Sequence, residues 1–273
     1  MTTATTSCSL DVPGVRLHYE VRGRGPLVLL VGSPMDANAF APLAELLAVD
    51  HTVVTTDPRG INRSTLDDPE QDSTPDLRAD DFSRLLAHLD AGPATVFGSS
   101  GGAVSGLALV QAHPEQVHTL VAHEPPLQEL LDDRERRRAD TEDIVTAYLS
   151  KGSLAAWRRF MQAAGFDLPE PVLQQMFGGE REPQQAADER RFFLHEIRPT
   201  TRWVPDVEAL SAASTRIVLG IGEQSVGQLC DLTSTALATA LGIEPTRFPG
   251  GHGGFAEDPA AFARRLLEVW GDS

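Results

Sequence analysis

Short apolar runs recur along the chain and alternate with longer stretches of helical periodicity. Apolar and polar residues alternate over Val15–Arg22, as in a strand with one buried face. Leu27–Val31 is continuously apolar, which is typical of a strand covered on both faces in a largely parallel sheet. Similar runs predict further strands at residues 51–56, 94–97, 119–122, 216–219 and 244–248.

Helical periodicity fills the gaps between these runs. One predicted helix begins at Thr74 and Pro75, a typical capping residue followed by a typical first helical residue. A second amphipathic helix begins at Pro259, directly after Asp258. Apolar residues of the first helix share one face at the i, i+3, i+4, i+7 spacing: Phe82, Leu85, Leu86 and Leu89. The alternation of strand and helix predicts an α/β fold with a doubly wound, mostly parallel sheet.

Residues 125–205 interrupt this alternation with about 80 residues of helical pattern. We interpret this stretch as an inserted helical cap, and residues 1–124 and 206–273 as one α/β core. The aromatic residues of the insertion, such as Trp157 and Phe192, are expected mainly to form the cap's own core.

Composition narrows the class of partner. The formal net charge of −16 disfavours nucleic acid and anionic membrane surfaces, because both would be repelled. No apolar stretch approaches the length of a membrane span, and no signal peptide is evident. Cys8 and Cys230 have neither disulfide-framework nor metal-site spacing. We therefore predict a cytoplasmic protein with a short frayed N-terminal tail, whose oligomeric state the sequence leaves open.

The chemistry is indicated first by a G-x-S-x-G pattern over residues 98–102. It follows a predicted strand and precedes a helix of small residues at 103–113. In such an elbow the central serine, Ser100, has a strained backbone and stands exposed above the sheet, and the flanking glycines avoid collisions. The helix N-terminus then directs the backbone N–H of Gly101 towards the reacting centre, where it can stabilise an oxyanion.

A serine hydroxyl needs a base to become a nucleophile, and His252 is the best candidate. It lies in a glycine-rich loop, residues 249–255, after the last predicted strand, so its imidazole can reach across the top of the sheet. None of the other seven histidines has this setting.

These features together resemble the α/β-hydrolase superfamily. The chain order is the same, with Ser100, a helical insertion and then His252 near the C-terminus. Residues 56–60 with Ser64 also resemble the superfamily's D-x-R-G-x-G-x-S segment, although Asn62 stands where glycine is usual. The resemblance extends over nearly the whole chain from about Val15.

The resemblance implies a second oxyanion donor in the loop after the Leu27–Val31 strand. Val31 stands where the family usually has histidine, but the family uses a backbone N–H at this point. Ser33 inherits that role.

The carboxylate that should orient the histidine is not at its commonest family position. Ser225 stands there, after the strand at 216–219, and Glu223 is two residues away. Some members supply the acid after the strand that follows the nucleophile helix, and Glu124 lies at that point. We favour Glu124 because a charge at the end of an apolar strand is costly to bury without a partner such as an imidazolium. Glu223, a site with no working acid, and a purely structural Glu124 that accepts backbone N–H groups stay open.

We therefore expect a serine hydrolase that acts on a small or medium-sized hydrophobic ester, lactone or thioester. Ser100, His252 and Glu124 would be catalytic, Gly101 and Ser33 would form the oxyanion hole, and neither a metal nor an organic cofactor is needed. Because the elbow residue is serine, the aspartate chemistry of haloalkane dehalogenases and epoxide hydrolases is disfavoured. Two alternatives stay open: the same triad used for carbon–carbon bond hydrolysis or lyase chemistry, and a non-catalytic ligand-binding protein.

Overall fold

The computed structural model describes residues 4–271, and within them nine strands form a single sheet. The strand order is β1-β2-β4-β3-β6-β7-β8-β9, and β5 pairs with β2. Strand β2 is antiparallel to its three neighbours, whereas all pairs from β4 to β9 are parallel. The strands are β1 Thr6–Val12, β2 Val15–Arg22, β3 Leu27–Val31, β4 Thr52–Thr56, β5 Thr65–Leu66, β6 Ala94–Ser99, β7 Val117–His123, β8 Arg216–Gly222 and β9 Thr246–Phe248.

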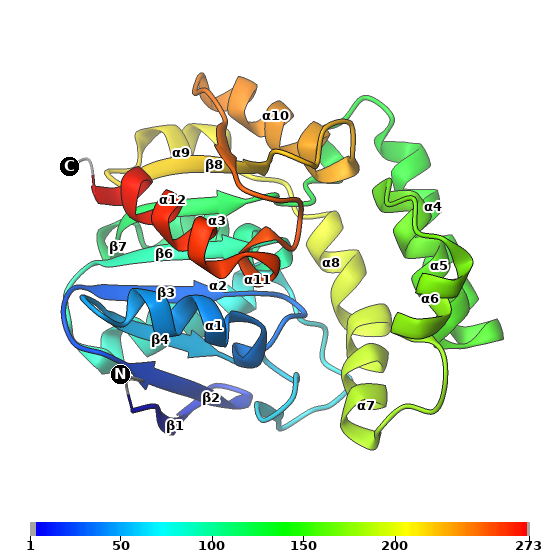
Figure 1. The fold of residues 1–273 in the computed structure, drawn as a ribbon, viewed down its shortest axis with the longest axis horizontal. Coiled ribbons are helices and arrows are strands. Elements are labelled where there is room, and N and C mark those ends of the chain that lie inside the picture. The colour runs from blue at the N-terminus through cyan, green and yellow to red at the C-terminus, as the bar shows by residue number, and fades with distance from the viewer. Residues whose placement is uncertain (1–3, 272–273) are drawn as a thin grey trace.

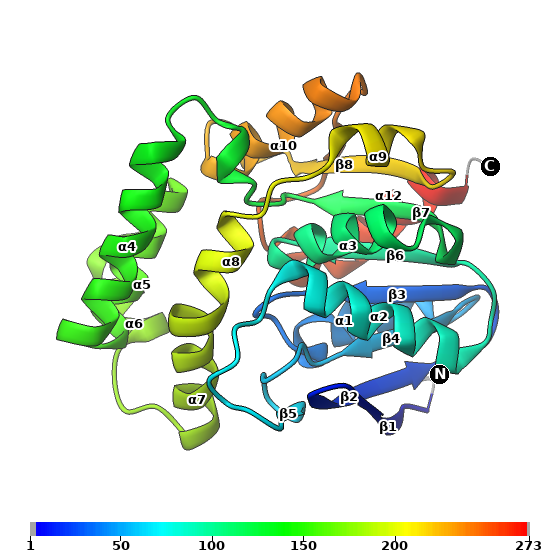
Figure 2. The ribbon, with the colours of Figure 1, turned by 180° about the vertical axis from the view of Figure 1, so that it is seen from behind.

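Helices cover both faces of this sheet, as Figures 1 and 2 show from opposite sides. The core helices are α1 Ala37–Leu47, α2 Pro75–Leu89, α3 Gly101–Ala112, α9 Val207–Ala212, α10 Leu229–Leu241, α11 Gly254–Glu257 and α12 Pro259–Gly271. Helices α1, α11 and α12 enclose one hydrophobic core, which includes Phe40, Phe97 and Phe262. Helices α2, α3, α9 and α10 enclose the other on the opposite face, which includes Phe82 and Leu107. The predicted α/β class with a doubly wound, mostly parallel sheet is confirmed.

The predicted strands lie where the sequence placed them, and most differ in length. Strand β6 continues two residues beyond the predicted end to Ser99, and β7 continues to His123. Both extensions are buried, so Ser100 and Glu124 follow directly on the last residues of two neighbouring strands. The predicted helix start is confirmed: the Thr74 side chain accepts a hydrogen bond of 3.2 Å from the backbone N–H of Leu77.

The expectation of a frayed N-terminal tail is wrong from Thr6 onward, and residues 1–3, on which it also falls, lie outside the described residues. Residues Thr6–Val12 form β1, which pairs along its whole length with β2. Gly14, with φ +78°, turns the chain between the two strands. Alternate residues of β1 are half-buried against the sheet: Cys8, Leu10 and Val12. That alternation is a strand signal, which the polar composition of the segment conceals.

The inserted segment is helical and lies beside the sheet in both views. Its helices are α4 Arg134–Lys151, α5 Ser153–Ala164, α6 Glu170–Phe177, α7 Pro183–Arg191 and α8 Ile197–Thr201. Between α7 and α8 the chain continues as one π-helical turn, Phe192–Glu196. A separate hydrophobic core joins Ile144, Phe192 and Phe193, with Trp157 packed against it. The division of the chain at residues 125 and 205 stays a prediction.

Within residues 4–271 there is no helix whose length and hydropathy would let it cross a bilayer.

The loop after β4 braces the loop after β3, which carries Ser33. The buried carboxylate of Asp57 accepts from the backbone N–H of Ala37 at 2.9 Å and from the guanidinium of Arg63. Asn62, at the position where the D-x-R-G-x-G-x-S pattern has glycine, adopts φ +49°. Asparagine tolerates this left-handed conformation, so the exchange preserves the turn.

Candidate active site

Ser100 stands at a sharp turn between β6 and α3. Its φ of +56° is unusual for a residue with a side chain, and its backbone N–H donates a 2.9 Å hydrogen bond to the carbonyl of His123 on the neighbouring strand. Such strain persists only where the surroundings enforce it, and it is common at functional sites. The turn presents the serine at the start of helix α3.

The glycines of the motif are required because backbone lies where their side chains would be. A Cβ on Gly102 would lie 2.3 Å from the carbonyl oxygen of Val31, and a Cβ on Gly98 would lie 2.6 Å from the carbonyl oxygen of Gly102. A Cβ on Gly101 would lie 2.8 Å from two oxygens of Ser33. The elbow is therefore packed directly against the loop that follows β3.

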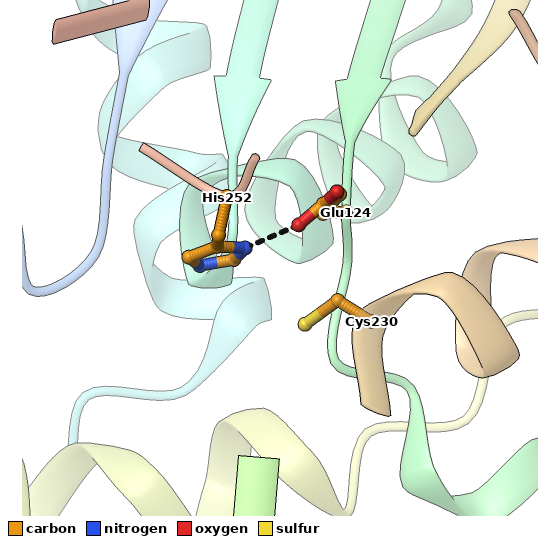
Figure 3. Close-up of side chains that lie close together, drawn as sticks. All are labelled: Glu124, Cys230 and His252. Carbon is orange, nitrogen blue, oxygen red and sulfur yellow. Dashed lines mark hydrogen bonds and ion pairs between the residues drawn. The ribbon is translucent and has the colours of Figure 1, made fainter. Parts of the chain in front are cut away.

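His252 and Glu124, which are 128 residues apart, form a close pair. The imidazole Nδ1 donates to Oε2 of Glu124 over 2.5 Å, as Figure 3 shows. Glu124 is completely buried, whereas a quarter of the His252 side-chain surface, 25%, stays accessible. Since Nδ1 is engaged by the carboxylate, Nε2 is the nitrogen left free for proton transfer.

Glu124 reaches His252 because the chain leaves strand β7 abruptly. The residue adopts φ +54°, so its side chain departs from the regular alternation of the strand. Its second oxygen, Oε1, accepts a 2.8 Å hydrogen bond from the backbone N–H of Gly222 at the end of β8. Burial alone would raise the pKa of this carboxyl, but the hydrogen bond from His252 and the positive charge of its imidazolium hold that pKa well below its usual range.

Glu223, the rival acid, lies outside this arrangement. Its side chain is exposed, and no hydrogen bond or ion pair joins it to His252. Ser225, at the family's commonest acid position, is fully buried. The structure therefore pairs His252 with Glu124 and leaves Glu223 aside, while among residues 4–271 no side-chain hydrogen bond joins Ser100 to His252.

Ser100 and His252 line one pocket between the sheet and the inserted helices. Most of its wall is apolar, with contributions from α4, α5, α8 and α10, from the π-helical turn before α8 and from loops that include the one after β3: Pro34, Pro126, Ile144, Phe160, Ala163, Ala164, Phe166, Phe192, Ile197 and Leu229. A mostly apolar lining with a few polar groups is typical of small-molecule sites.

Two backbone N–H groups beside Ser100 have no acceptor among residues 4–271. Gly101 is the first residue of α3, where helical N–H groups have no partner within the helix, and Ser33 donates no backbone hydrogen bond. Both residues line the pocket. Donors so placed can stabilise a developing oxyanion.

His123, for which the sequence indicated no role, is a core residue. It is fully buried among the rings of Phe97, Phe248 and Phe262. Burial lowers the pKa of its imidazole to about 4, so His123 is neutral near pH 7.

Two further side chains at the site were missed by sequence reasoning. Cys230, near the start of α10, lies with Glu124 and His252 so that their candidate ligand atoms are within 4.8 Å of one another (Figure 3). Nothing in the sequence around this cysteine signals it. Glu196 also lines the pocket, and its position within the apolar run Phe192–Ile197 was a signal that could have been followed.

Cysteine, histidine and glutamate are ligand types that Zn²⁺ accepts. Among the described residues, Glu124, Cys230 and His252 are the only such group close enough to hold a metal ion. Glu124 and His252 already bind each other, however, so a metal ion would have to displace that hydrogen bond.

Several known proteins are similar to this chain over most of its length. The family model of the alpha/beta hydrolase fold matches residues 25–199. An uncharacterized hydrolase of Bacillus subtilis, YraK, is 35% identical over 96% of this chain and 94% of its own length. A zearalenone hydrolase of Bionectria ochroleuca is 25% identical over 97% of each chain. The structure of a thermophilic esterase from Thermogutta terrifontis superposes with a TM-score of 0.71 at 18% identity, over 97% of each chain.

The fold and the family match define the class of protein. The chain belongs to the α/β-hydrolase fold family. It is an enzyme of that family, and its reaction class is hydrolysis.

Proposed function

We propose that this hydrolase cleaves a small or medium-sized hydrophobic ester, lactone or thioester through an acyl-enzyme on Ser100. The observation that carries the proposal is the 2.5 Å hydrogen bond between His252 and Glu124, with Ser100 and His252 on the wall of one apolar pocket. A serine, an imidazole and a carboxylate in this relation form the standard means of activating a hydroxyl.

In the first half-reaction the Ser100 Oγ attacks the substrate carbonyl carbon, and Nε2 of His252 takes the hydroxyl proton. The negative charge that develops on the carbonyl oxygen is stabilised by the N–H groups of Gly101 and Ser33. Glu124 stabilises the imidazolium that forms. Collapse breaks the bond to the leaving oxygen or sulfur, which receives the proton from His252, and leaves the acyl group on Ser100.

Water completes the cycle. His252 removes a proton from a water molecule as its oxygen attacks the acyl carbon, and the same N–H groups stabilise the second oxyanion. Collapse releases the carboxylic acid and returns the proton to the Ser100 oxygen. Every proton and electron pair is supplied by substrate, water and these side chains.

The assignment of Glu124 as the carboxylate that orients His252 gives the first testable prediction. We expect Glu124→Gln to lower kcat/KM for p-nitrophenyl butyrate by about three to four orders of magnitude, because an amide neither fixes the imidazole tautomer nor stabilises its charge. The matched control is Glu223→Gln, which changes an exposed carboxylate on the neighbouring loop. That variant should stay within about twofold of wild type. If Glu223→Gln lost this activity while Glu124→Gln kept it, Glu223 would be the catalytic carboxylate.

A further inference from the structure

Glu196 is a buried carboxyl group that the proposed reaction does not use. Only 1% of its surface is exposed, and it lines the same pocket as Ser100 and His252. It ends the π-helical turn between α7 and α8. Turns of this type are rare and frequently occur at functional sites.

The two oxygens of this carboxyl differ in their surroundings. Oε1 accepts a short hydrogen bond from the hydroxyl of Ser33, the residue proposed to supply one oxyanion donor. Oε2 is buried and has no hydrogen-bond partner among the described residues. A buried polar atom without a partner costs free energy, and in a native structure it calls for an explanation.

No basic side chain provides that partner. Arg78 is fully buried nearby, but its guanidinium donates to Ser73, Ser105 and Thr200 instead. Arg191, whose charge also acts on Glu196, donates to the carbonyl of Pro69. Within residues 4–271 Glu196 forms no ion pair.

The protonation of Glu196 is set by opposing effects. Burial raises the pKa of its carboxyl, while the charge of Arg78, the Ser33 hydrogen bond and the charge of Arg191 lower it, and Asp188 raises it. The net shift is upward. A substrate hydroxyl suits either form, because it can donate to a carboxylate and accept from a carboxylic acid.

We propose that Glu196 is a specificity-determining residue that hydrogen-bonds a hydroxyl group of the substrate, a few bonds from the scissile carbonyl. The distance along the substrate follows from the contact between Glu196 and Ser33, which places the carboxyl next to the oxyanion site. This inference rests on the proposed function, since it assumes a carbonyl substrate at Ser100. It narrows the substrate to a hydroxylated ester, lactone or thioester.

The experiment compares matched esters with and without a hydroxyl group. One pair places the hydroxyl on the acyl side: p-nitrophenyl 3-hydroxybutyrate and p-nitrophenyl butyrate. The other places it on the alcohol side: 3-hydroxypropyl butyrate and propyl butyrate. For at least one pair, wild type should prefer the hydroxylated ester in kcat/KM by about tenfold or more, the size expected for one hydrogen bond to a carboxyl group. A ratio near one for both pairs overturns the proposal without any variant.

Variants then test whether the preference depends on Glu196. In Glu196→Leu the ratio of the two kcat/KM values should fall to near one, and Glu196→Gln, which retains polar atoms, should keep part of it. Glu142→Leu is the control: it removes a glutamate of α4 that pairs with Arg198 of α8 but does not line the pocket. It should keep the wild-type ratio.

The control outcomes separate this inference from the proposed function. If Glu196 only held the Ser33 loop in place, its loss would slow both esters alike and leave the ratio unchanged, which overturns the proposal. If wild type hydrolyses none of the four esters and Ser100 does not react with a fluorophosphonate, the proposed function itself has failed.

Discussion

His252 lies between a carboxylate and a thiol, and its proton affinity follows from both. Burial lowers the pKa of the imidazole, but the nearby Cys230 sulfur and the hydrogen bond with Glu124 outweigh it, and the net effect raises the pKa above its ordinary value of 6.5. A general base works only when it is neutral. The raised pKa therefore keeps His252 protonated, and inactive as a base, to a higher pH.

The raised pKa of His252 predicts how the activity depends on pH. For wild type, kcat/KM should climb with pH and reach half its maximum above pH 6.5, because the rising limb reports the loss of the His252 proton in the free enzyme. Cys230→Ala should move this limb to lower pH, since it removes one of the groups that favour the imidazolium. The control is Cys8→Ala, which alters the other free cysteine, in β1. If the rising limb had the same midpoint in wild type and Cys230→Ala, Cys230 would not raise the pKa of His252.

The residues of the site were predictable to different degrees. The elbow and the glycine-rich loop made Ser100 and His252 stand out, because both sequence settings place a side chain above the sheet. The sequence favoured Glu124 but left Glu223 open, because the choice depends on the backbone turn of φ +54° at Glu124. Cys230 was unpredictable, since only the packing of α10 brings it to His252.

At the scale of elements, the junction of β3, β6 and α3 fixes the nucleophile. Gly102 has no room for a side chain, because backbone of the Val31–Gly32 segment lies within 2.7 Å of its ideal Cβ position. Rigid backbone cannot move aside as a flexible side chain could.

We therefore expect Gly102→Ala to lower the free energy of unfolding by about 1–3 kcal/mol, as for other overpacked sites. Gly271→Ala provides the control, because nothing lies within 4 Å of its ideal Cβ. It should change the stability by less than about 0.5 kcal/mol. Urea unfolding at fixed pH measures both variants. Similar stability in the two would show that the elbow tolerates a side chain.

Predicted and observed elements agree where burial dominates and differ where pairing with a neighbour decides. The run that became β3 is apolar throughout and the run that became β6 is mostly apolar, so their type followed from composition. Strand β1 depends on its antiparallel partner β2 instead. Its half-buried positions alternate with exposed Ser9 and Asp11, which resembles a polar tail when read alone.

For the whole molecule, the alternation of strands and helices was sufficient to predict the fold class, because few arrangements bury both faces of a parallel sheet. The pocket was not predictable in this way. It depends on how the inserted helices pack against the sheet, a contact between segments far apart in sequence. Glu196 and the apolar wall come from that contact, so the hydroxyl group proposed for the substrate could be inferred only at this scale.

The account as a whole requires an activated hydroxyl on Ser100, and labelling with a fluorophosphonate tests this most directly. Intact mass and peptide mapping should show a single adduct on Ser100 in wild type and none in folded Ser100→Ala. Ser99→Ala is the matched control: Ser99 is buried beside His123, so this variant should retain the adduct. Absence of labelling in folded wild type, or equal labelling of Ser100→Ala, would contradict the account and favour a protein that binds its ligand without cleaving it.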